Sequence, residues 1–377
     1  MAKYRIAWLP GDGVGVDVMD AARKVLDFLK IDAEYIHGDI GWEFWCKEGN
    51  PLPERTIEVL KKTDAAMFGA ITSKNKEDAV KELAPELQGK GLIYRSPIVV
   101  MRQMFDLYSC VRPCKAFKKN PLNFKENIDI TVFRENTEGL YAGVEFCPIP
   151  EDVRVAMEKS NKGMARFNKF PAAEVALSTR IMTKQGCERI IRKAFEFADK
   201  NKKTKVTLVE KPNVLRETGG LMLATMKRVA EEYKSKGIDW EETNIDAMCM
   251  WLLKNPEKYQ VLVAENMFGD IISDLCAQMV GGLGFAYSGN IGEKYAVFEP
   301  THGSAPKYQG MNKVNPLATI LSAMMMLEWL GEKDKSAQVY AAVGKVIEEG
   351  QARTYDMGGK TTTSGMADAV VDAIKRL

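Results

Sequence analysis

The sequence has very little of the chemistry that holds zinc or a disulfide framework. Among its 377 residues there are only two histidines, His37 and His302, and neither lies near a pair of cysteines. Because zinc sites are built from Cys and His ligands at short spacings, this argues against zinc and leaves oxygen atoms as ligands for any metal. The seven cysteines are scattered without a Cys-x-x-Cys pair, which favours reduced, mostly buried thiols.

The sequence also lacks a surplus of charge and a long hydrophobic run. It contains 53 Lys and Arg against 51 Asp and Glu, a formal charge of +2, and this balance argues against a nucleic-acid partner or a polybasic membrane surface. No apolar run approaches the roughly 18 residues of a transmembrane helix. Residues 1–10 do not have the layout of a secretory signal peptide. We expect a soluble cytoplasmic protein, with a mature mitochondrial protein as the alternative.

Short apolar segments alternate with longer helical patterns along most of the chain. Strands are expected at residues 4–9, 65–71, 129–133, 205–209 and 260–264, and helices at 218–233, from about 270, at 316–329 and at 333–349. This alternation predicts an α/β protein with a largely parallel sheet. Residues 144–170 differ, because they carry Pro148, Pro150, many charges and weak periodicity. They predict a protruding arm, with a disordered loop as the alternative.

A glycine-rich turn follows the first expected strand and invites comparison with a dinucleotide-binding turn. It contains Gly11, Gly13 and Gly15, but the fingerprint Gly-x-Gly-x-x-Gly requires its third glycine at the position of Val16. Glycine at a strand-to-helix turn is common for steric reasons alone. We therefore expect any nucleotide to be bound elsewhere.

The better candidate for a nucleotide site is the segment from Glu299 to Tyr308. Small residues at 303–305 would let a ligand approach the backbone, and His302 offers an aromatic or hydrogen-bonding face. Lys307 supplies a point charge suited to a phosphate. The alternative is a polar loop that only connects a strand to a helix.

Three arginines indicate an acidic ligand. Arg102 and Arg112 lie ten residues apart, Arg112 stands in an apolar stretch, and Arg134 opens a polar motif. An unpaired guanidinium in apolar surroundings is costly, so a carboxylate of the protein or of a substrate must meet it. Three such groups favour a small polycarboxylic acid, because guanidinium groups bind carboxylates in a bidentate manner; structural ion pairs are the alternative.

Three carboxylates and one lysine are candidates for a metal site and for ligand binding. Asp270 and Asp274 would point from one face of a helix that begins near residue 269, where they would repel unless a cation lay between them; complementarity with the helix dipole is the alternative explanation. Asp246 is a third candidate ligand, and all-oxygen ligation suits Mg²⁺ or Mn²⁺. Lys211 follows an expected strand, at the edge where α/β sheets bind ligands, although a solvated lysine is the alternative.

Taken together, these motifs resemble the isocitrate/isopropylmalate dehydrogenase family of β-decarboxylating dehydrogenases. The resemblance runs essentially end to end, in six motifs: the Gly-Asp-Gly opening, residues 96–112, residues 134–143, Lys211-Pro212-Asn213, residues 269–274 and residues 299–316. It implies a large domain of residues 1–105 and 284–377 and a small domain of residues 106–283, with the arm at about 144–170. It also implies a homodimer whose active sites are completed by the partner subunit.

The resemblance further implies a role for individual residues. The substrate carboxylates would be bound by Ser96, Arg102, Arg112 and Arg134; Mg²⁺ or Mn²⁺ by Asp270, Asp274 and the Asp246 of a second copy. Tyr141 and the Lys211 of a second copy would be the acid–base pair. The nicotinamide cofactor would be held by Thr72, Asn213, Glu299, His302, Gly303, Ser304, Ala305, Pro306, Lys307, Tyr308, Asn315 and Tyr355.

The resemblance favours isocitrate as the substrate and NADP as the cofactor. Residues 134–143 are similar to isocitrate dehydrogenases, whereas Ser96-Pro97-Ile98 is similar to homoisocitrate dehydrogenases and replaces an asparagine of the isocitrate enzymes with Ile98. Lys307 stands where relatives that use NAD tend to carry an acid, so NADP is expected, with NAD usable. The alternatives are a homoisocitrate or isopropylmalate-like dehydrogenase using NAD, and a non-catalytic regulatory subunit on the same fold.

Overall fold

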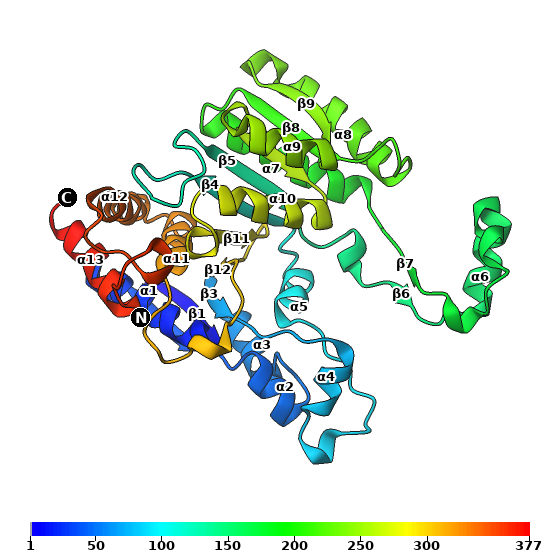
Figure 1. Cartoon of the computed structure of the whole chain (residues 1–377), viewed down its shortest axis with the longest axis horizontal. Coiled ribbons are helices and arrows are strands. Elements are labelled where there is room, and N and C mark those ends of the chain that lie inside the picture. The colour runs from blue at the N-terminus through cyan, green and yellow to red at the C-terminus, as the bar shows by residue number, and fades with distance from the viewer. Residues whose placement is uncertain (1) are drawn as a thin grey trace.

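The computed structural model describes residues 2–377, which fold around one ten-stranded sheet (Figure 1). The order of strands across the sheet is β2-β1-β3-β12-β11-β4-β5-β10-β8-β9. The strands are β1 (Tyr4–Gly11), β2 (Ala33–His37), β3 (Ala65–Ala70), β4 (Ser109–Lys115), β5 (Asp129–Glu135), β8 (Lys205–Glu210), β9 (Asp239–Asn244), β10 (Val261–Ala264), β11 (Tyr287–Ile291) and β12 (Ala296–Pro300).

Helices cover both faces of this sheet. They are α1 (Val14–Phe28), α2 (Trp42–Glu48), α3 (Glu54–Leu60), α4 (Lys76–Lys81), α5 (Pro97–Met104), α6 (Glu151–Ser160), α7 (Lys184–Lys200), α8 (Thr218–Tyr233), α9 (Ile245–Lys254), α10 (Asn266–Met279), α11 (Leu317–Trp329), α12 (Lys333–Glu349) and α13 (Thr363–Lys375). The α/β class predicted from the sequence is confirmed.

The sheet is parallel toward both edges and antiparallel in its centre. β1 pairs in parallel with β2 and β3, and β8 pairs in parallel with β9 and β10. The central pairs β12–β11, β11–β4 and β4–β5 are antiparallel. The prediction of a largely parallel sheet therefore holds for the flanks, but the sequence pattern did not predict β4, β11 and β12.

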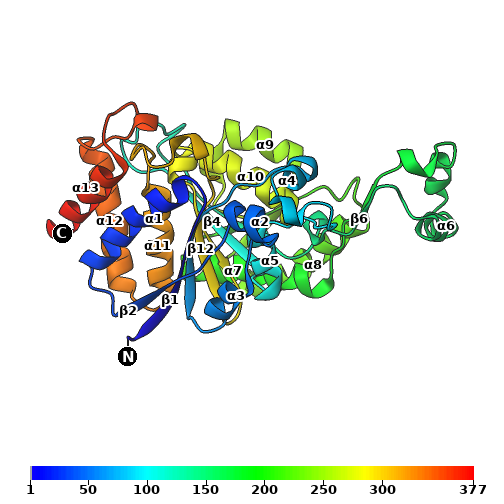
Figure 2. The same cartoon turned by 90° about the horizontal axis from the view of Figure 1, so that it is seen from below.

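The two ends of the chain build one half of the molecule, and its middle builds the other. In the first half, α1, α11, α12 and α13 share a hydrophobic core with β1, β3 and β12. In the second half, α7 and α8 cover one side of the sheet and α9 and α10 the other (Figure 2). The large domain of both chain ends and the smaller central domain are confirmed, while their predicted boundaries remain predictions.

A thin arm projects from the central domain (Figures 1 and 2). Its base is a two-stranded antiparallel ribbon of β6 (Glu145–Phe146) and β7 (Leu177–Ser178), and its end carries α6, none of whose side chains is buried. The predicted protruding arm is present, and its chain returns only at β7, beyond residue 170. Within residues 2–377, no helix is both long and apolar enough to cross a membrane.

The central strands sort their side chains between the two faces of the sheet. Successive residues of a strand point to opposite faces. On β4 and β5, Arg112 and Arg134 reach α10, whereas Val111 and Phe133 pack in the core beneath α7 and α8. This alternation brings two of the predicted arginines to the same face as the predicted carboxylates.

Candidate active site

The helix that carries the predicted metal ligands begins earlier than the sequence suggested. α10 starts at Asn266, directly after Glu265, whose carboxylate accepts a hydrogen bond from a backbone N–H of the first turn. Such a cap satisfies one of the free donors at a helix start. Asp270 and Asp274 therefore lie in the body of the helix rather than at its first turn, one above the other on one face. The proximity of the helix dipole does not account for their placement.

Arg134 is almost completely buried against this helix. Its Nη1 donates to Oδ1 of Asp270 at 2.6 Å, and its Nε and Nη2 donate to Oδ1 of Asn266 at 3.0 and 2.7 Å. Helix and strand approach so closely that a Cβ at Gly269 would lie 2.7 Å from the Cβ of Arg134. Glycine is thus required at position 269 for the arginine to reach its carboxylate.

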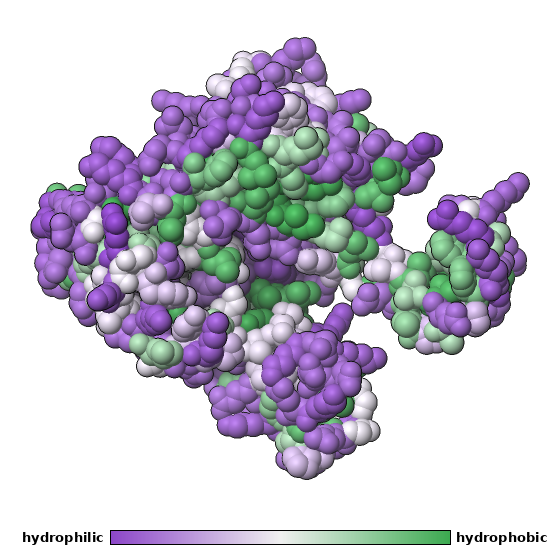
Figure 3. Space-filling model, viewed as in Figure 1, coloured by the Kyte–Doolittle hydropathy of each residue, from purple (hydrophilic) through white to green (hydrophobic). Residues whose placement is uncertain are grey.

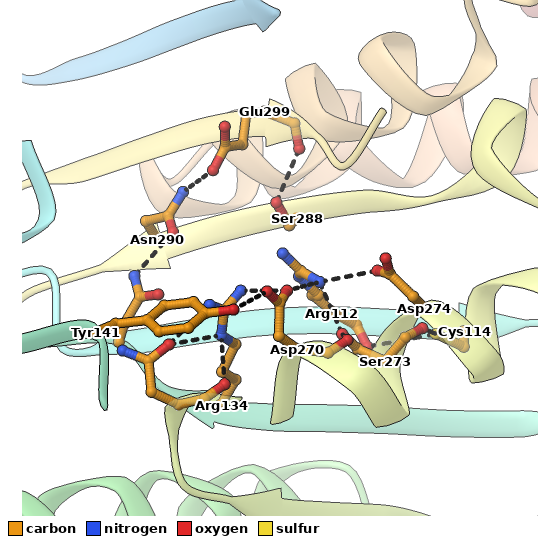
Figure 4. A network of polar contacts seen from close by, with 12 residues as sticks. Arg112, Cys114, Arg134, Tyr141, Asp270, Ser273, Asp274, Ser288, Asn290 and Glu299 are labelled. Carbon is orange, nitrogen blue, oxygen red and sulfur yellow. Dashed lines mark hydrogen bonds and ion pairs between the residues drawn. The ribbon is translucent and has the colours of Figure 1, made fainter. Parts of the chain in front are cut away.

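Arg112 lies between the two carboxylates of α10. Its Nη1 is 3.1 Å from Oδ1 of Asp270, 3.1 Å from Oδ1 of Asp274 and 2.7 Å from the Oγ of Ser273 (Figure 4). The sequence required a cation between these acids, and in the single chain that cation is a guanidinium. The carboxylates expected to meet Arg112 are therefore the protein's own.

Arg102, in the last turn of α5, is held by a different carboxylate. Its Nε donates to Oδ1 of Asn290 at 3.0 Å, and its Nη2 donates to Oε1 of Glu299 at 3.1 Å. Asn290 also donates to Glu299 at 2.7 Å, so the three side chains form one buried network. Glu299, predicted at the cofactor, makes its contacts here with the arginine side of the site.

The electrostatics confirm that the three arginines share one region. Burial, followed by the charges of Arg112 and Arg102, lowers the pKa of Arg134 to about 10. For Asp270, burial acts to raise the pKa, but the charges of Arg134 and Arg112, the hydrogen bond from Tyr141 and the charge of Arg102 together outweigh burial and hold the pKa below its ordinary value. Asp270 thus remains a carboxylate at neutral pH and is the shared counterion of Arg112 and Arg134.

Tyr141 extends the cluster toward solvent. Its hydroxyl donates to Oδ2 of Asp270 at 3.0 Å, and its ring centroid lies 5.2 Å from the guanidinium carbon of Arg134. Burial and the neighbouring negative charge of Asp270 raise the pKa of Tyr141. The phenol therefore carries its proton at neutral pH and is suited to act as an acid.

Ser96 and Ile98, at the start of α5, lie in different surroundings. Ser96 is the residue immediately before α5, and its side chain makes no capping bond with that helix. Ile98, in the first turn, is buried in the hydrophobic core of the large domain with Leu9 and Met101. The side chain at position 98 therefore packs into the core, one helical turn before Arg102 on the same helix.

Lys211 and Asp246 are joined to each other rather than to the cluster. The Nζ of Lys211 bonds Oδ1 of Asp246, and this hydrogen bond lowers the pKa of Asp246. Within residues 2–377, neither forms a hydrogen bond or ion pair with Asp270 or Asp274, and no group of three potential metal ligands is gathered. Asn213, close to Lys211 in sequence, is exposed.

Beside the 299–308 segment lies a cavity of about 410 Å³. Of the predicted cofactor residues it is lined by His302, Gly303, Ala305, Tyr308, Asn315 and Tyr355. Burial lowers the pKa of His302, so its imidazole is neutral. Its Nδ1 lies 3.0 Å from the carbonyl oxygen of Gly303, while its buried Nε2 has no partner within the described chain. A buried polar atom without a partner indicates that a ligand completes this cavity.

Two tyrosines that line this cavity, Tyr308 and Tyr355, are each flanked by a lysine that lies outside the lining. The ring centroids of Tyr308 and Tyr355 are 5.7 Å apart. The Nζ of Lys307 lies 4.9 Å from the ring centroid of Tyr308, and the Nζ of Lys313 lies 4.8 Å from that of Tyr355. Neither lysine has a carboxylate within 4.0 Å in the described part of the chain. Two positive charges therefore stand beside the cavity, whose own lining includes the carboxylate of Asp356.

The glycine-rich turn at residues 11–15 packs against the 301–308 loop. The backbone N–H of Val14 donates to the carbonyl oxygen of Ser304 at 2.8 Å, and a Cβ at Gly13 would lie 2.2 Å from that same oxygen. Oγ1 of Thr72 is 2.6 Å from the Oγ of Ser304, and the N–H of Thr72 donates to Asp12 at 2.8 Å. The glycines of this turn thus serve close packing against the 301–308 loop.

Five residues of these networks were missed by the sequence reasoning. They are Asp12, Asn266, Ser273, Asn290 and Lys313. Asn266 and Ser273 stand four residues before and three after Asp270, so the helix spacing alone could have placed them on its face. For the other three, no local pattern marks the long-range contact.

Comparison with known proteins identifies the family of the chain. The sequence profile of the isocitrate/isopropylmalate dehydrogenases matches residues 5–370. The chain belongs to this family. Family members use NAD(P) and a divalent metal ion such as Mg²⁺ or Mn²⁺ and act on hydroxy acids.

Individual relatives span the family's different activities. Protein DlpA of Legionella pneumophila is 40% identical over 99% of this chain, and the chain spans 59% of the length of that protein. The homoisocitrate dehydrogenase of Methanocaldococcus jannaschii is 39% identical over 99% of this chain and 98% of its own. The crystal structure of isocitrate dehydrogenase from Methylococcus capsulatus superposes with a TM-score of 0.85 at 35% identity, covering 99% of both chains.

Proposed function

We propose that this family member oxidises and decarboxylates isocitrate to 2-oxoglutarate and CO₂ while reducing NADP, with Mg²⁺ or Mn²⁺. The observation that carries the proposal is the pairing of Arg112 and Arg134 with Asp270, while Arg102, held by Glu299, lies close enough for its charge to act on the same carboxylate. Three guanidinium groups in one region match a small acid with several carboxylates. A site of this kind is difficult to explain as structure alone, because buried ion pairs contribute little net stability.

The metal fits the donor set of α10. Asp270 and Asp274 offer the hard carboxylate oxygens that Mg²⁺ and Mn²⁺ prefer, and Asp246 of a second copy would complete the set. When bound, the ion would act as a Lewis acid that lowers the pKa of the substrate hydroxyl and stabilises developing negative charge. Arg112 would then exchange its bonds to the two aspartates for bonds to a substrate carboxylate.

Proton transfer is assigned to two side chains. Lys211 of a second copy would accept the proton of the substrate hydroxyl, while the carbon that bears this hydroxyl transfers its hydride to the nicotinamide. Tyr141, whose phenol is protonated at neutral pH, would deliver its proton to the carbon from which CO₂ departs. Its hydroxyl already touches Asp270, so the acid stands beside the proposed metal ligands.

The preference for NADP rests on Lys307 and Lys313, which lie beside the two tyrosines that line the 410 Å³ cavity. The partner-free Nε2 of His302 and the paired tyrosine rings fit a nucleotide. Lys307 and Lys313 would meet the 2′-phosphate, which NAD lacks. A carboxylate at this place would repel that phosphate, and none is paired with either lysine within residues 2–377.

The active form is proposed to be a homodimer, since Lys211 and Asp246 would act at the site of a second copy. Support comes from apolar side chains that α9 and α10 leave exposed: Met250 is 70%, Leu253 51% and Ile271 51% exposed. Figure 3 displays a hydrophobic patch over these two helices. Contiguous apolar surface of this kind marks a site of protein association.

Initial rates with three acids and two nucleotides test the proposal. Isocitrate, homoisocitrate and isopropylmalate are each supplied with NADP and with NAD, in the presence of Mn²⁺ and after addition of EDTA. We expect the highest kcat/KM for isocitrate with NADP and loss of activity with EDTA. Faster turnover of homoisocitrate, the second candidate suggested by Ser96-Pro97-Ile98 and by a 39% identical relative, would replace our assignment. No turnover of any acid would favour a regulatory subunit.

A further inference from the structure

A second and larger cavity, of about 800 Å³, lies on the opposite face of the sheet from α10. Its floor is formed by β4, β5, β11 and β12, with α7 on one side and α11 and α12 on the other. None of the residues assigned above to substrate, metal or cofactor lines it. It therefore belongs to neither the arginine cluster nor the nucleotide cavity.

The cavity lies directly behind the arginine cluster. Val111 and Phe133 line it, while their strand neighbours Arg112 and Arg134 point to α10 on the other side. Because strand side chains alternate, any molecule resting on this floor would touch the same two strands that carry the arginines. The exposed apolar patch of α9 and α10 lies on the far side of the sheet, so a dimer formed there would leave this cavity open.

Aromatic rings supply much of the apolar part of the lining. Six rings contribute to it, namely Phe133, Phe197, Tyr287, Phe298, Trp329 and Tyr340. Methionines of α11 add flexible apolar surface. A volume of this size is within the range of small-molecule sites, which are mostly apolar with a few placed polar groups. The body of a matching ligand would be planar and apolar.

The polar groups at the rim give the cavity one cationic corner. Lys115 and Lys203 share a single carboxylate, with Nζ to Oδ2 of Asp129 distances of 3.8 and 2.8 Å, and neither has another within 4.0 Å in the described chain. By contrast, Lys200 has a partner of its own, Glu328, at 3.1 Å across the mouth. Lys193 is likewise paired, with Glu196 at 3.4 Å. The one positive charge in excess therefore lies at the corner formed by Lys115 and Lys203. The Nζ of Lys115 also lies 5.6 Å from the ring centroid of Tyr340, so this corner adjoins the aromatic lining.

We propose that this cavity binds a small planar aromatic anion, a carboxylate or sulfonate, with its ring system against the aromatic floor and its charge beside the ammonium groups of Lys115 and Lys203, on their sides away from the Asp129 that they share. A free phosphate would leave the apolar lining unused, and a nucleotide brings more negative charge than one surplus lysine balances. Both are therefore disfavoured. The ligand would stand between α7 and α11 and against β4 and β5, and would thereby alter how tightly Arg112 and Arg134 hold a substrate acid. This last step rests on the proposed function, whereas the binding itself does not.

Fluorescence titration with 8-anilinonaphthalene-1-sulfonate, an aromatic sulfonate, tests the binding step. The full chain is kept saturated with NADP so that the nucleotide cavity does not contribute. We expect one saturable site in the parent protein, Lys203→Ala to weaken binding about tenfold, and Met325→Trp, which fills the cavity, to abolish it. Lys202→Ala is the matched control, since Lys202 is exposed and does not line the cavity, and should leave binding unchanged.

Each other outcome overturns the proposal. These are absence of saturable binding in the NADP-saturated protein, or equal loss of affinity in Lys202→Ala and Lys203→Ala. Thermal melts of all variants check folding, and the alanine variants keep the test meaningful if Met325→Trp does not fold. In a separate arm, the probe should change the KM for isocitrate at least twofold in the parent and in Lys202→Ala, but not in Lys203→Ala. If no acid is turned over, the proposed function fails while the binding result stands.

Discussion

Replacement of Asp270 by asparagine removes the carboxylate that is shared by Arg112 and Arg134 while keeping the shape of the side chain. In the structure Asp270 is 31% exposed at its side chain, and it bonds Nη1 of Arg134 at 2.6 Å and Nη1 of Arg112 at 3.1 Å. The side chain of Arg134 is only 1% exposed, and its other hydrogen bonds go to the neutral Asn266. The substitution would therefore leave a buried guanidinium without a negative partner.

The size of the effect follows from that burial. Removing one partner of a buried ion pair costs about 3–5 kcal/mol, because the remaining charge is uncompensated. Asp270 is partly accessible, so we place the loss in the free energy of unfolding at about 3 kcal/mol. Asp274→Asn is the matched control on the same helix: its side chain is 58% exposed and contacts only Arg112 among the arginines. For an exposed pair the loss should stay below about 1 kcal/mol.

Urea unfolding at neutral pH measures both losses, with the slope of the transition as a check that the unfolded state is unchanged. The pH dependence offers an independent arm. Because the arginine charges hold the pKa of Asp270 below its ordinary value of 3.8, the stability it contributes is complete above that value. It is lost as the pH falls through the lower folded pKa, so parent and Asp270→Asn should converge in acid. Equal losses for the two variants at neutral pH would refute the reasoning.

Three further outcomes are expected. Lys307→Asp should lower the ratio of kcat/KM for NADP over NAD by roughly 10- to 100-fold, since a charged hydrogen bond contributes about 1.5–3 kcal/mol; an unchanged ratio would remove Lys307 from the phosphate site. Tyr141→Phe should reduce kcat about 10²- to 10⁴-fold with little change in KM, and near-parent turnover would exclude the phenol as the acid. Leu253→Glu should yield a monomer in light scattering with its melting temperature nearly unchanged, whereas a persisting dimer would place the interface elsewhere.

Local patterns were sufficient for the flanks of the fold and failed at its centre. The strands at 4–9 and 205–209 are mostly apolar and are followed by helices, a pattern that is typical of parallel sheets buried on both faces. β4 and β11 instead carry Arg112 and Asn290 among apolar residues. These polar residues belong to the candidate site. Because they interrupt the apolar pattern of β4 and β11, the two strands could not be predicted from that pattern.

The candidate site was predictable in its residue types but not in its pairing. Four-residue spacing placed Asp270 and Asp274 on one helical face, and the need for a cation between them followed from repulsion. The sequence could not show that Arg112 supplies it, because this contact joins residues about 160 positions apart. Nor could it show that Lys211 and Asp246 pair with each other.

The pairing of Arg112 with both aspartates explains how the cluster remains stable before ligands arrive. Arg102, Arg112 and Arg134 are matched within the chain by Glu299, Asp270 and Asp274, so the buried region carries little net charge. A polycarboxylic acid alone would upset this balance and meet the aspartates as like charges, and a divalent cation alone would meet Arg112. Acid and cation together add little net charge. The cation would replace Arg112 as the partner of the two aspartates, and the acid would replace the aspartates as the partner of Arg112. The geometry therefore favours their joint binding, with Arg112 turning from the aspartates to the substrate.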